Sequence, residues 1–325
     1  MQRPSLVTSS GGPEDLAKAA RLAEEAGFES VWATEFYDRS ATVALAAMAQ
    51  ATNEIELGSA IAYAFGRTPV VLAAEARDLD ELSGGRLTLG LGTGTRRMQQ
   101  DWHGLDGEHP ASRMEELLPL LRRLWRLHES PIEHDGRFYR LNVKPTAPPR
   151  PPIREQIPIY MAGVNKRMIE AAGAVGDGLV GHPLFTPEYV TEVARPALAA
   201  RGNGVPIAGY ITTSVSDDRD QARRDAAAII AFNSTVKTYR AVHRVSGFEK
   251  EAEAVREAWT RGDFDGMAGA VTDEMIDTIA LAGTPDEVRA RFEERWDGVY
   301  ERPLLWPPAF RGDEAVRALI EAFAA

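Results

Sequence analysis

The 325-residue chain contains no cysteine and no long apolar run. The missing cysteine excludes disulfide bonds, cysteine-ligated metal sites and thiol nucleophiles. A membrane-spanning helix needs about 18 consecutive apolar residues, and no such run occurs. The first residues, Met1 to Ser5, also lack the apolar region of a secretion signal. We therefore expect a soluble, cytoplasmic protein.

Basic residues are scarcer than acidic ones. Lys and Arg total 37 and Asp and Glu total 48, which gives a net charge of −11. Such a balance argues against a nucleic-acid partner and against a polybasic membrane anchor. An anionic ligand would need a local group of basic side chains. The expected partner is a small-molecule substrate, and a homodimer is one assembly that we consider.

Several catalytic motifs are missing as well. The six histidines include no HExxH sequence and no helical pair spaced four residues apart, so no metal site is expected. No GxSxG sequence or Ser-His-Asp arrangement is recognisable. The glycine-rich stretch 90–94 lacks the third glycine of a dinucleotide-binding fingerprint, and no acidic residue ends the following strand about 20 positions later.

What the sequence does contain is a regular alternation of short apolar runs and longer helical patterns. Strands are predicted for residues 6–8, 30–34, 55–61, 87–91, 158–162, 178–181, 207–213 and 300–305. Strands that alternate with helices pair in parallel through right-handed crossovers, and eight such units close a barrel. The predicted fold is an α/β protein, a (β/α)8 TIM barrel. We expect one domain over residues 1–325, with a mostly helical insertion at about 217–280.

Local signals mark smaller features of this barrel. Thr284 to Glu287 is a capping box that begins a helix. Residues 132–139 are typical of a β-hairpin with an Asp-Gly turn. The proline-rich stretch 145–158 is either a domain linker or a rigid surface loop. We favour the loop because βα units resume directly after it.

Candidate catalytic residues follow from the barrel, since its active site forms at the carboxyl ends of the strands. Thr34 and Glu35 end the second predicted strand, Tyr63 follows the third, and His182 follows the sixth. Glu35, His182 and Tyr63 are therefore the predicted catalytic residues, because carboxylate, imidazole and phenol groups can exchange protons with a substrate. A solvated loop carboxylate is the competing interpretation for Glu35, and a structural histidine is the competing one for His182.

Two backbone segments at the same end are candidates for cofactor binding. Residues 90–94 either let a flat ring or a chain of phosphates approach closely, or simply end a strand that needs small residues. Residues 162–165 connect a strand to a helix, where free N–H groups and the helix dipole bind anions. An ordinary turn capped by Asn165 is the alternative there. Lys166 and Arg167, directly after this turn, favour an anionic ligand.

The order of these motifs resembles the luciferase-like superfamily of flavin and deazaflavin enzymes. The similarity spans about residues 14–310 and is carried by residues 22–32, 56–61, 67–69, 79–94, 113–116, 138–139, 162–165 and 176–179. Residues 61–67 and 160–183 look closest to the actinobacterial branch that depends on the deazaflavin coenzyme F420.

The resemblance implies a cofactor ring over the barrel mouth, with a non-prolyl cis peptide bond beneath it, which we place between Ala60 and Ile61. It implies coenzyme F420 as the cofactor, with FMN as the alternative, and hydride transfer to or from a small organic molecule. The cofactor-binding residues that we predict are Thr34, Ala60, Ile61, Gly92, Thr93, Gly94, Arg96, Arg97, Ala162, Gly163, Val164 and Asn165. The pairs Arg96-Arg97 and Lys166-Arg167 are predicted to bind the carboxylates of the F420 tail.

Two positions depart from some deazaflavin dehydrogenases of this superfamily. Those enzymes carry Asp-His after the second strand, where this chain has Glu35-Phe36, and a glutamate after the GTG motif, where it has Thr95. Sugar-phosphate dehydrogenase activity is therefore not expected. The leading hypothesis is an F420-dependent oxidoreductase. The alternatives are a reduced-FMN-dependent monooxygenase and a catalytically silent flavin-binding barrel.

Overall fold

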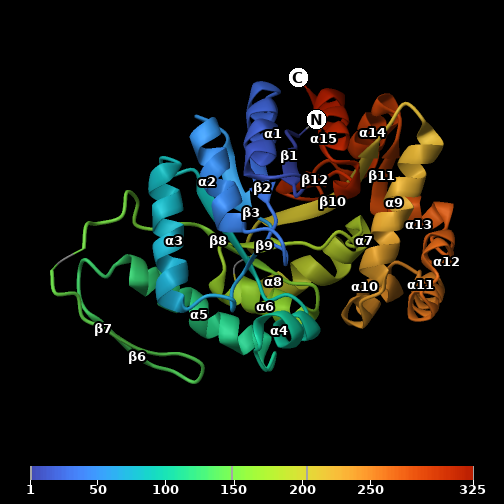
Figure 1. The fold of residues 1–325 in the computed structure, drawn as a ribbon. Helices are drawn as coiled ribbons and strands as arrows, with labels where there is room; N and C mark the ends of the chain where they lie inside the picture. Colours follow the sequence, from blue (N-terminus) through green and yellow to red (C-terminus); the bar gives the residue numbers. More distant parts are fainter. Residues whose placement is uncertain (1, 148, 203, 325) are drawn as a thin grey trace.

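The computed structural model describes residues 2–147, 149–202 and 204–324 (Figure 1). The strands are β1 (Ser5–Thr8), β2 (Ser30–Ala33), β3 (Glu56–Ser59), β4 (Ala62–Tyr63), β5 (Leu87–Gly92), β6 (Ile132–Asp135), β7 (Arg140–Val143), β8 (Ile159–Ala162), β9 (Gly178–Val180), β10 (Ile207–Val215), β11 (Ala280–Gly283) and β12 (Arg302–Trp306). The α-helices are α1 (Pro13–Glu25), α2 (Ala41–Ala51), α3 (Pro69–Leu82), α4 (Arg96–His103), α5 (Pro110–Trp125), α6 (Lys166–Val175), α7 (Pro187–Tyr189), α8 (Arg195–Ala199), α9 (Arg219–Ser234), α10 (Arg240–Val245), α11 (Glu249–Arg261), α12 (Phe264–Gly269), α13 (Asp273–Ile279), α14 (Pro285–Arg291) and α15 (Asp313–Phe323).

In the described part of the chain, eight parallel strands close into a barrel. Their order is β1-β2-β3-β5-β8-β9-β10-β12, and β12 pairs back with β1. The long helices lie around the outside of this barrel (Figure 1). Each of the eight predicted strands coincides with one barrel strand to within a few residues, so the predicted (β/α)8 fold is confirmed.

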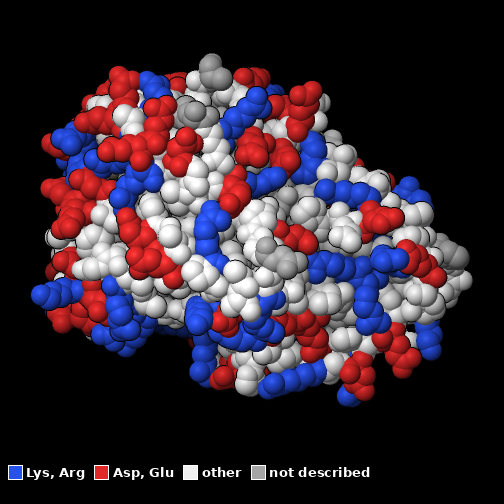
Figure 2. Space-filling view, turned by 180° about the vertical axis from the view of Figure 1, so that it is seen from behind, with Lys and Arg blue, Asp and Glu red and all other residues white. Residues whose placement is uncertain are grey.

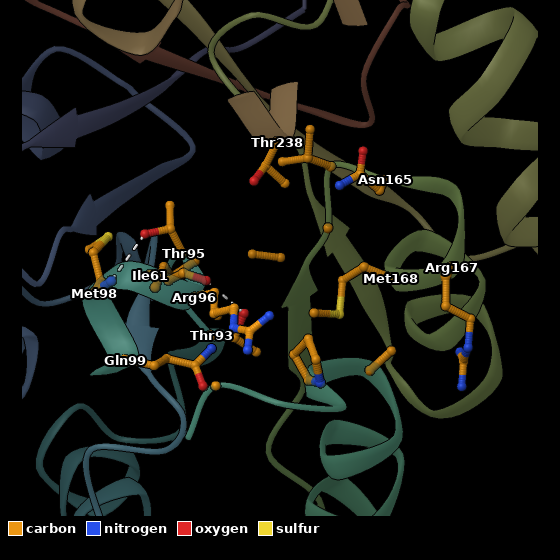
Figure 3. Close-up of a pocket in the computed structure, with 18 of the residues that line it drawn as sticks. Ile61, Thr93, Thr95, Arg96, Met98, Gln99, Asn165, Arg167, Met168 and Thr238 are labelled. Carbon is orange, nitrogen blue, oxygen red and sulfur yellow. Dashed lines mark hydrogen bonds between the residues drawn. The ribbon is translucent and has the colours of Figure 1, made fainter. Parts of the chain in front are cut away.

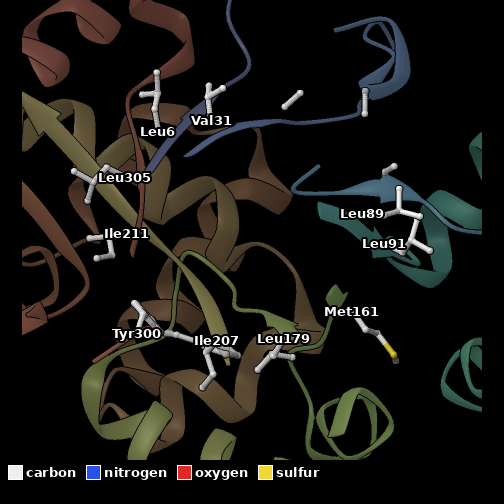
Figure 4. Packing of buried hydrophobic residues seen from close by; sticks show 14 of the residues in the cluster. Leu6, Val31, Leu89, Leu91, Met161, Leu179, Ile207, Ile211, Tyr300 and Leu305 are labelled. Atoms are coloured by element: carbon white, nitrogen blue, oxygen red, sulfur yellow. The ribbon is translucent and has the colours of Figure 1, made fainter. Parts of the chain in front are cut away.

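Side chains of the barrel strands alternate between two apolar layers. Neighbouring residues of a strand point to opposite faces, so each strand contributes to both layers. The barrel interior is filled by Val7, Trp32, Ala60, Tyr160, Val180, Ala208, Tyr210 and Leu304. The layer between strands and helices, part of which is shown in Figure 4, includes Leu6, Val31, Leu179, Ile207 and Leu305.

Trp32 fits inside the barrel because the facing residue of the next strand is glycine. The register of β2 and β3 places Trp32 beside Gly58. A Cβ atom at Gly58 would lie 2.3 Å from the indole ring, far inside van der Waals contact. The indole N–H donates a hydrogen bond to the Ser30 hydroxyl at 2.7 Å. The position of Trp32 inside the barrel is thus specified by the small size of Gly58 and by one buried hydrogen bond to Ser30.

The third predicted strand, residues 55–61, is interrupted in the structure. β3 ends at Ser59, a cis peptide bond joins Ala60 to Ile61, and β4 follows. The cis bond predicted at this position is confirmed. The Tyr210 hydroxyl donates a hydrogen bond to the Ala60 carbonyl, which ties the interruption to the opposite side of the barrel.

The insertion and the hairpin form where they were predicted, with two differences. Helices α9 to α13 fill the insertion, and β6 and β7 form an antiparallel hairpin that projects from the barrel (Figure 1). The first difference is the hairpin loop: Asp135 pairs with Arg140, so residues 136–139 form the loop and the second strand lies beyond the predicted range 132–139. The second difference is β11, which was not predicted. This strand pairs with residues 212–215 of β10, beyond the point where β10 pairs with β9.

The proline-rich stretch packs against the barrel, apart from residue 148, which lies outside the described residues. The Arg154 guanidinium donates to the Asp80 carboxylate of α3 at 2.5 Å, and that carboxylate is buried. Arg150 pairs with Glu81 of the same helix at 3.1 Å. These contacts support the loop interpretation.

Charged side chains of both signs are interspersed over the face shown in Figure 2. Among the described helices, none is long and apolar enough to cross a membrane.

Candidate functional site

Two adjoining cavities open at the carboxyl ends of the barrel strands. The first cavity has a volume of about 620 Å³ and the second of about 610 Å³. They share six lining residues, Ile61, Tyr63, Ala162, Gly163, Val164 and His182. The two cavities therefore form one elongated space, with the cis-peptide segment and His182 where they meet.

Three helices begin at the first cavity. Thr95 caps α4, His109 precedes α5 and Asn165 precedes α6, and all three line the cavity wall. The first N–H groups of a helix have no partner within the helix, and its dipole is positive at that end. The Thr95 hydroxyl accepts the Met98 N–H at 3.2 Å, as drawn in Figure 3. The remaining N–H groups make this wall suitable for an anion.

Glycine allows close packing of side chains at the first cavity. A Cβ atom at Gly92 would lie 2.7 Å from Cδ1 of Ile61 and 3.2 Å from Cβ of Ala162. Gly94 has φ +66°, a left-handed conformation that side chains rarely adopt. The side chains of Ile61 and Ala162 thus pack directly against the Gly92 backbone, and the close approach of a ligand to residues 90–94 stays a prediction.

The second cavity is largely apolar. Its walls include the loop after β2, Tyr210 of β10, Trp306 at the end of β12, and helix α9. The large apolar side chains are Phe36, Tyr210, Ile229, Phe232, Trp306 and Phe310. Cavities of this size, with apolar walls and few polar groups, are typical small-molecule sites.

His182 lies at the junction as a neutral imidazole. Its Nδ1 accepts the Leu184 N–H at 3.2 Å, so the ring proton is assigned to Nε2. The Tyr239 ring covers it with a centroid separation of 4.0 Å. Burial, with the nearby His243, lowers the pKa of His182 to about 3. At neutral pH the side chain is therefore a hydrogen-bond donor through Nε2.

Glu35 is held by three hydrogen bonds. Arg67 approaches its two carboxylate oxygens at 2.6 and 2.9 Å, and the Tyr63 N–H donates to it at 2.7 Å. Its side chain is only 8% exposed. This arrangement links the end of β2 to the segment after the cis bond. The predicted catalytic role of Glu35 stays a prediction. Its contacts are structural, because it acts as a clamp that holds Arg67 and the Tyr63 backbone together.

Tyr63 lines both cavities and is almost fully buried. Burial raises the pKa of its phenol well above the ordinary value, and the negative charge of Glu35 raises it further. The hydroxyl therefore keeps its proton at neutral pH.

The other predicted residues are divided between the cavities. Thr34 and Ala60 line the second cavity, and the residues that line the first are Gly92, Thr93, Gly94, Arg96 and Asn165. Two of the predicted cations, Arg97 and Lys166, are among the lining residues of neither cavity.

The predicted cations already have acidic partners. Arg96 pairs with Glu108, and Arg97, which is 87% exposed, pairs with Asp101 at 2.9 Å. Arg167 pairs with Glu115 at 2.6 Å, and its guanidinium points away from the centre of the first cavity in Figure 3. Arg96 is therefore the predicted cation that faces the cavity most directly, and binding of a cofactor tail stays a prediction.

Sequence reasoning missed several lining residues. Trp306 ends the last barrel strand and Phe310 follows it, so the strand-end rule could have found them. Phe232 and Tyr239 come from the insertion, and His109 from the segment between two helices. No local pattern connects these three residues to a barrel mouth.

Comparisons with known proteins agree with this geometry. The family model for luciferase-like monooxygenases matches residues 1–301. A 5,10-methylenetetrahydromethanopterin reductase of Archaeoglobus fulgidus is 31% identical over 296 residues, which cover 86% of this chain and 85% of that protein. A putative coenzyme F420-dependent oxidoreductase of Mycobacterium tuberculosis is 28% identical over 301 residues, which cover 85% and 86%.

A solved structure is similar over almost its whole length. The coenzyme F420-dependent tetrahydromethanopterin reductase of Methanopyrus kandleri aligns with a TM-score of 0.82 and 25% identity, covering 99% of this chain and 97% of that one. The family model covers the barrel strands from β1 to β10, the whole lining of the first cavity, and the second cavity apart from Trp306, Ala309 and Phe310. The chain belongs to the luciferase-like monooxygenase family.

Proposed function

We propose that this protein is a coenzyme F420-dependent oxidoreductase that transfers a hydride between the deazaflavin and a small organic substrate. The observation that carries the proposal is the meeting of the two cavities at His182, one with an anion-binding wall and one apolar. Relatives that match 85% or more of the chain and are named for coenzyme F420 or for a pterin reductase support it.

The residues of the first cavity fit this cofactor. The start of α6, at residues 163–165, would hold the phosphate through backbone N–H groups. Ile61, Tyr63 and residues 92–94, which line the same cavity, would face the flat ring. When bound, the deazaflavin supplies the centre that gives or takes the hydride.

His182 and Tyr63 would act on the substrate oxygen. Addition of a hydride to a carbonyl carbon places negative charge on the oxygen, and a hydrogen-bond donor aimed there stabilises that charge. Neutral His182 offers its Nε2–H, and the protonated Tyr63 hydroxyl is a second donor. Glu35 would keep Tyr63 in place through the backbone hydrogen bond.

Cofactor titration tests this proposal. Purified protein is titrated with coenzyme F420 and with FMN while ligand fluorescence is recorded, and native mass spectrometry gives the stoichiometry. We expect tighter binding of the deazaflavin. Preferential binding of FMN, with oxygen consumption when reduced FMN is supplied, would instead support the monooxygenase alternative that the family model favours. Absence of turnover with any acceptor would support a silent flavin-binding barrel.

We further propose that the protein is a single domain that acts in the cytoplasm without a nucleic-acid partner. The net charge of −11 supports the last point. The homodimer also stays a proposal, and light scattering coupled to size-exclusion chromatography tests it directly.

A further inference from the structure

Exposed phenylalanine side chains line the second cavity and indicate what kind of substrate it binds. Three of its phenylalanines are exposed to solvent, Phe36 by 37%, Phe232 by 57% and Phe310 by 61%. They come from three separate segments, the loop after β2, helix α9 and the segment after β12. Exposed aromatic side chains that converge on one cavity mark a binding site for apolar surface.

The deeper walls of this cavity are apolar too. Trp306, Tyr210 and Ile229 line it, and the Trp306 and Tyr210 rings pack edge to face at 5.5 Å. The Tyr210 hydroxyl is already used, because it donates to the Ala60 carbonyl. The interior therefore offers a ligand aromatic and aliphatic surface rather than hydrogen bonds.

The charged groups of the cavity do not select a charged ligand. The Glu35 carboxylate is neutralised by Arg67. Asp38 and Arg39, which also line the cavity, are adjacent and opposite in sign, so together they bring no net charge to it. The Arg39 Nε is buried and has no hydrogen-bond partner among the described residues, so it is a donor available to an uncharged ligand oxygen. An anionic ligand would meet Arg39 only together with the adjacent Asp38, so it would lose its hydration here without gaining a net electrostatic attraction.

At the inner end of the cavity, His182 offers a ligand a further polar group. The Leu184 N–H occupies Nδ1 of His182, and the structure gives Nε2 no partner among the residues that it describes. A neutral imidazole N–H binds a carbonyl or hydroxyl oxygen. His182 lines both cavities, so this donor belongs to the region where they meet.

We infer that the second cavity binds an uncharged, largely apolar molecule with a single oxo or hydroxyl oxygen that accepts a hydrogen bond from Nε2 of His182. The inference rests on the proposed function only for the presence of a reacting oxygen. It also distinguishes this chain's substrate from a polar pterin, because a pterin ring would bury several donors and acceptors against apolar walls.

The test measures binding to the purified full-length protein, so that it does not depend on turnover. The probes are cyclodecanone, cyclodecane, decanoate and pterin, and the readouts are isothermal titration calorimetry and quenching of tryptophan fluorescence. Each titration is run without cofactor and again with coenzyme F420 present. We expect cyclodecanone to bind about tenfold or more tightly than decanoate and pterin. Equal or tighter binding of decanoate or pterin would overturn the inference.

Variants locate the binding. Phe232→Ala and Phe310→Ala should each weaken cyclodecanone about tenfold, an effect of the size expected for an aromatic contact in a site. Phe264→Ala is the matched control, because this phenylalanine is 67% exposed on α12 and lines neither cavity. His182→Phe should abolish the preference for cyclodecanone over cyclodecane while both still bind.

The outcomes separate the inference from the proposed function. Failure of all apolar probes in both series, with coenzyme F420 still bound, would overturn the inference alone. Failure of F420 to bind while cyclodecanone binds would overturn the proposed cofactor and leave the apolar site standing. Equal effects of the Phe232 and Phe264 variants would show non-specific adsorption and would also overturn the inference.

Discussion

The Arg67 guanidinium donates one hydrogen bond to each oxygen of the Glu35 carboxylate, with nitrogen–oxygen distances of 2.6 and 2.9 Å. These residues follow two different barrel strands, and the pair is mostly shielded from solvent. The same carboxylate holds the Tyr63 N–H at 2.7 Å. Glu35, which the sequence predicts to be catalytic, thus holds the backbone of Tyr63 near the cis peptide bond.

Glu35→Gln should destabilise the protein by ~1–3 kcal/mol, because a buried partner of Arg67 loses its charge. Urea unfolding followed by circular dichroism measures this change. Asp101→Asn is the control, since it breaks an exposed pair with Arg97 and should cost less than ~0.5 kcal/mol. A Glu35→Gln variant of unchanged stability but greatly reduced turnover would contradict the clamp and support direct catalysis.

The partly buried imidazole of His182 should make the stability of the protein depend on pH. Its pKa is about 3 in the folded protein and 6.5 ordinarily, so the unfolded chain binds the proton more readily. The contribution of His182 to the free energy of unfolding is therefore fully present above pH 6.5 and is lost as the pH falls toward 3.

His182→Gln should flatten this dependence, with a difference in the pH 5-to-7 change of unfolding free energy of ~1–2 kcal/mol. Urea unfolding at the two pH values measures it. His243→Gln is a second variant, because burial also lowers the pKa of His243, to about 4. An unaltered slope in both variants would show that other groups govern the acid limb.

Arg96→Ala should weaken deazaflavin binding more than Arg97→Ala, because Arg96 lines the first cavity and Arg97 does not. We expect a loss of ~5–10-fold for Arg96→Ala at low salt, reduced at high salt by screening. Fluorescence titration of the cofactor at two ionic strengths measures both. In the double variant, the loss of binding free energy for the deazaflavin should not exceed the sum of the losses in the two single variants. Binding that ignores salt and both substitutions would exclude these cations from the tail site.

Gly90→Ala should disrupt the barrel near the site. A Cβ atom there would lie 1.7 Å from the Ser59 carbonyl oxygen, which cannot move without breaking β3 from β5. We expect a cost of ~3 kcal/mol or more, or failure to fold. Gly269→Ala is the matched control in helix α12, where nothing lies within 4 Å, and it should be neutral or slightly stabilising. Equal melting temperatures for the two variants would contradict the packing described here.

The sequence by itself determined the barrel and the end of it that carries the site. Short apolar runs alternating with helices leave parallel pairing with crossovers as the arrangement that buries all strands. The strand-end rule then placed Tyr63, Gly92, Gly163 and His182 at one mouth, and all four line the cavities. The cis bond between Ala60 and Ile61 came from family resemblance rather than from any local pattern.

Only the tertiary structure decided what those residues can do. Glu35 meets Arg67 across 32 positions of sequence, and this pairing turns a free carboxylate into a clamp. Tyr239, from the insertion, covers His182 and helps to remove it from water, so its imidazole stays neutral. Phe232 of α9 completes the apolar cavity from the same insertion. Periodicity reports which face of a strand or helix is buried, but charge state and cavity walls depend on contacts between segments that no local pattern relates.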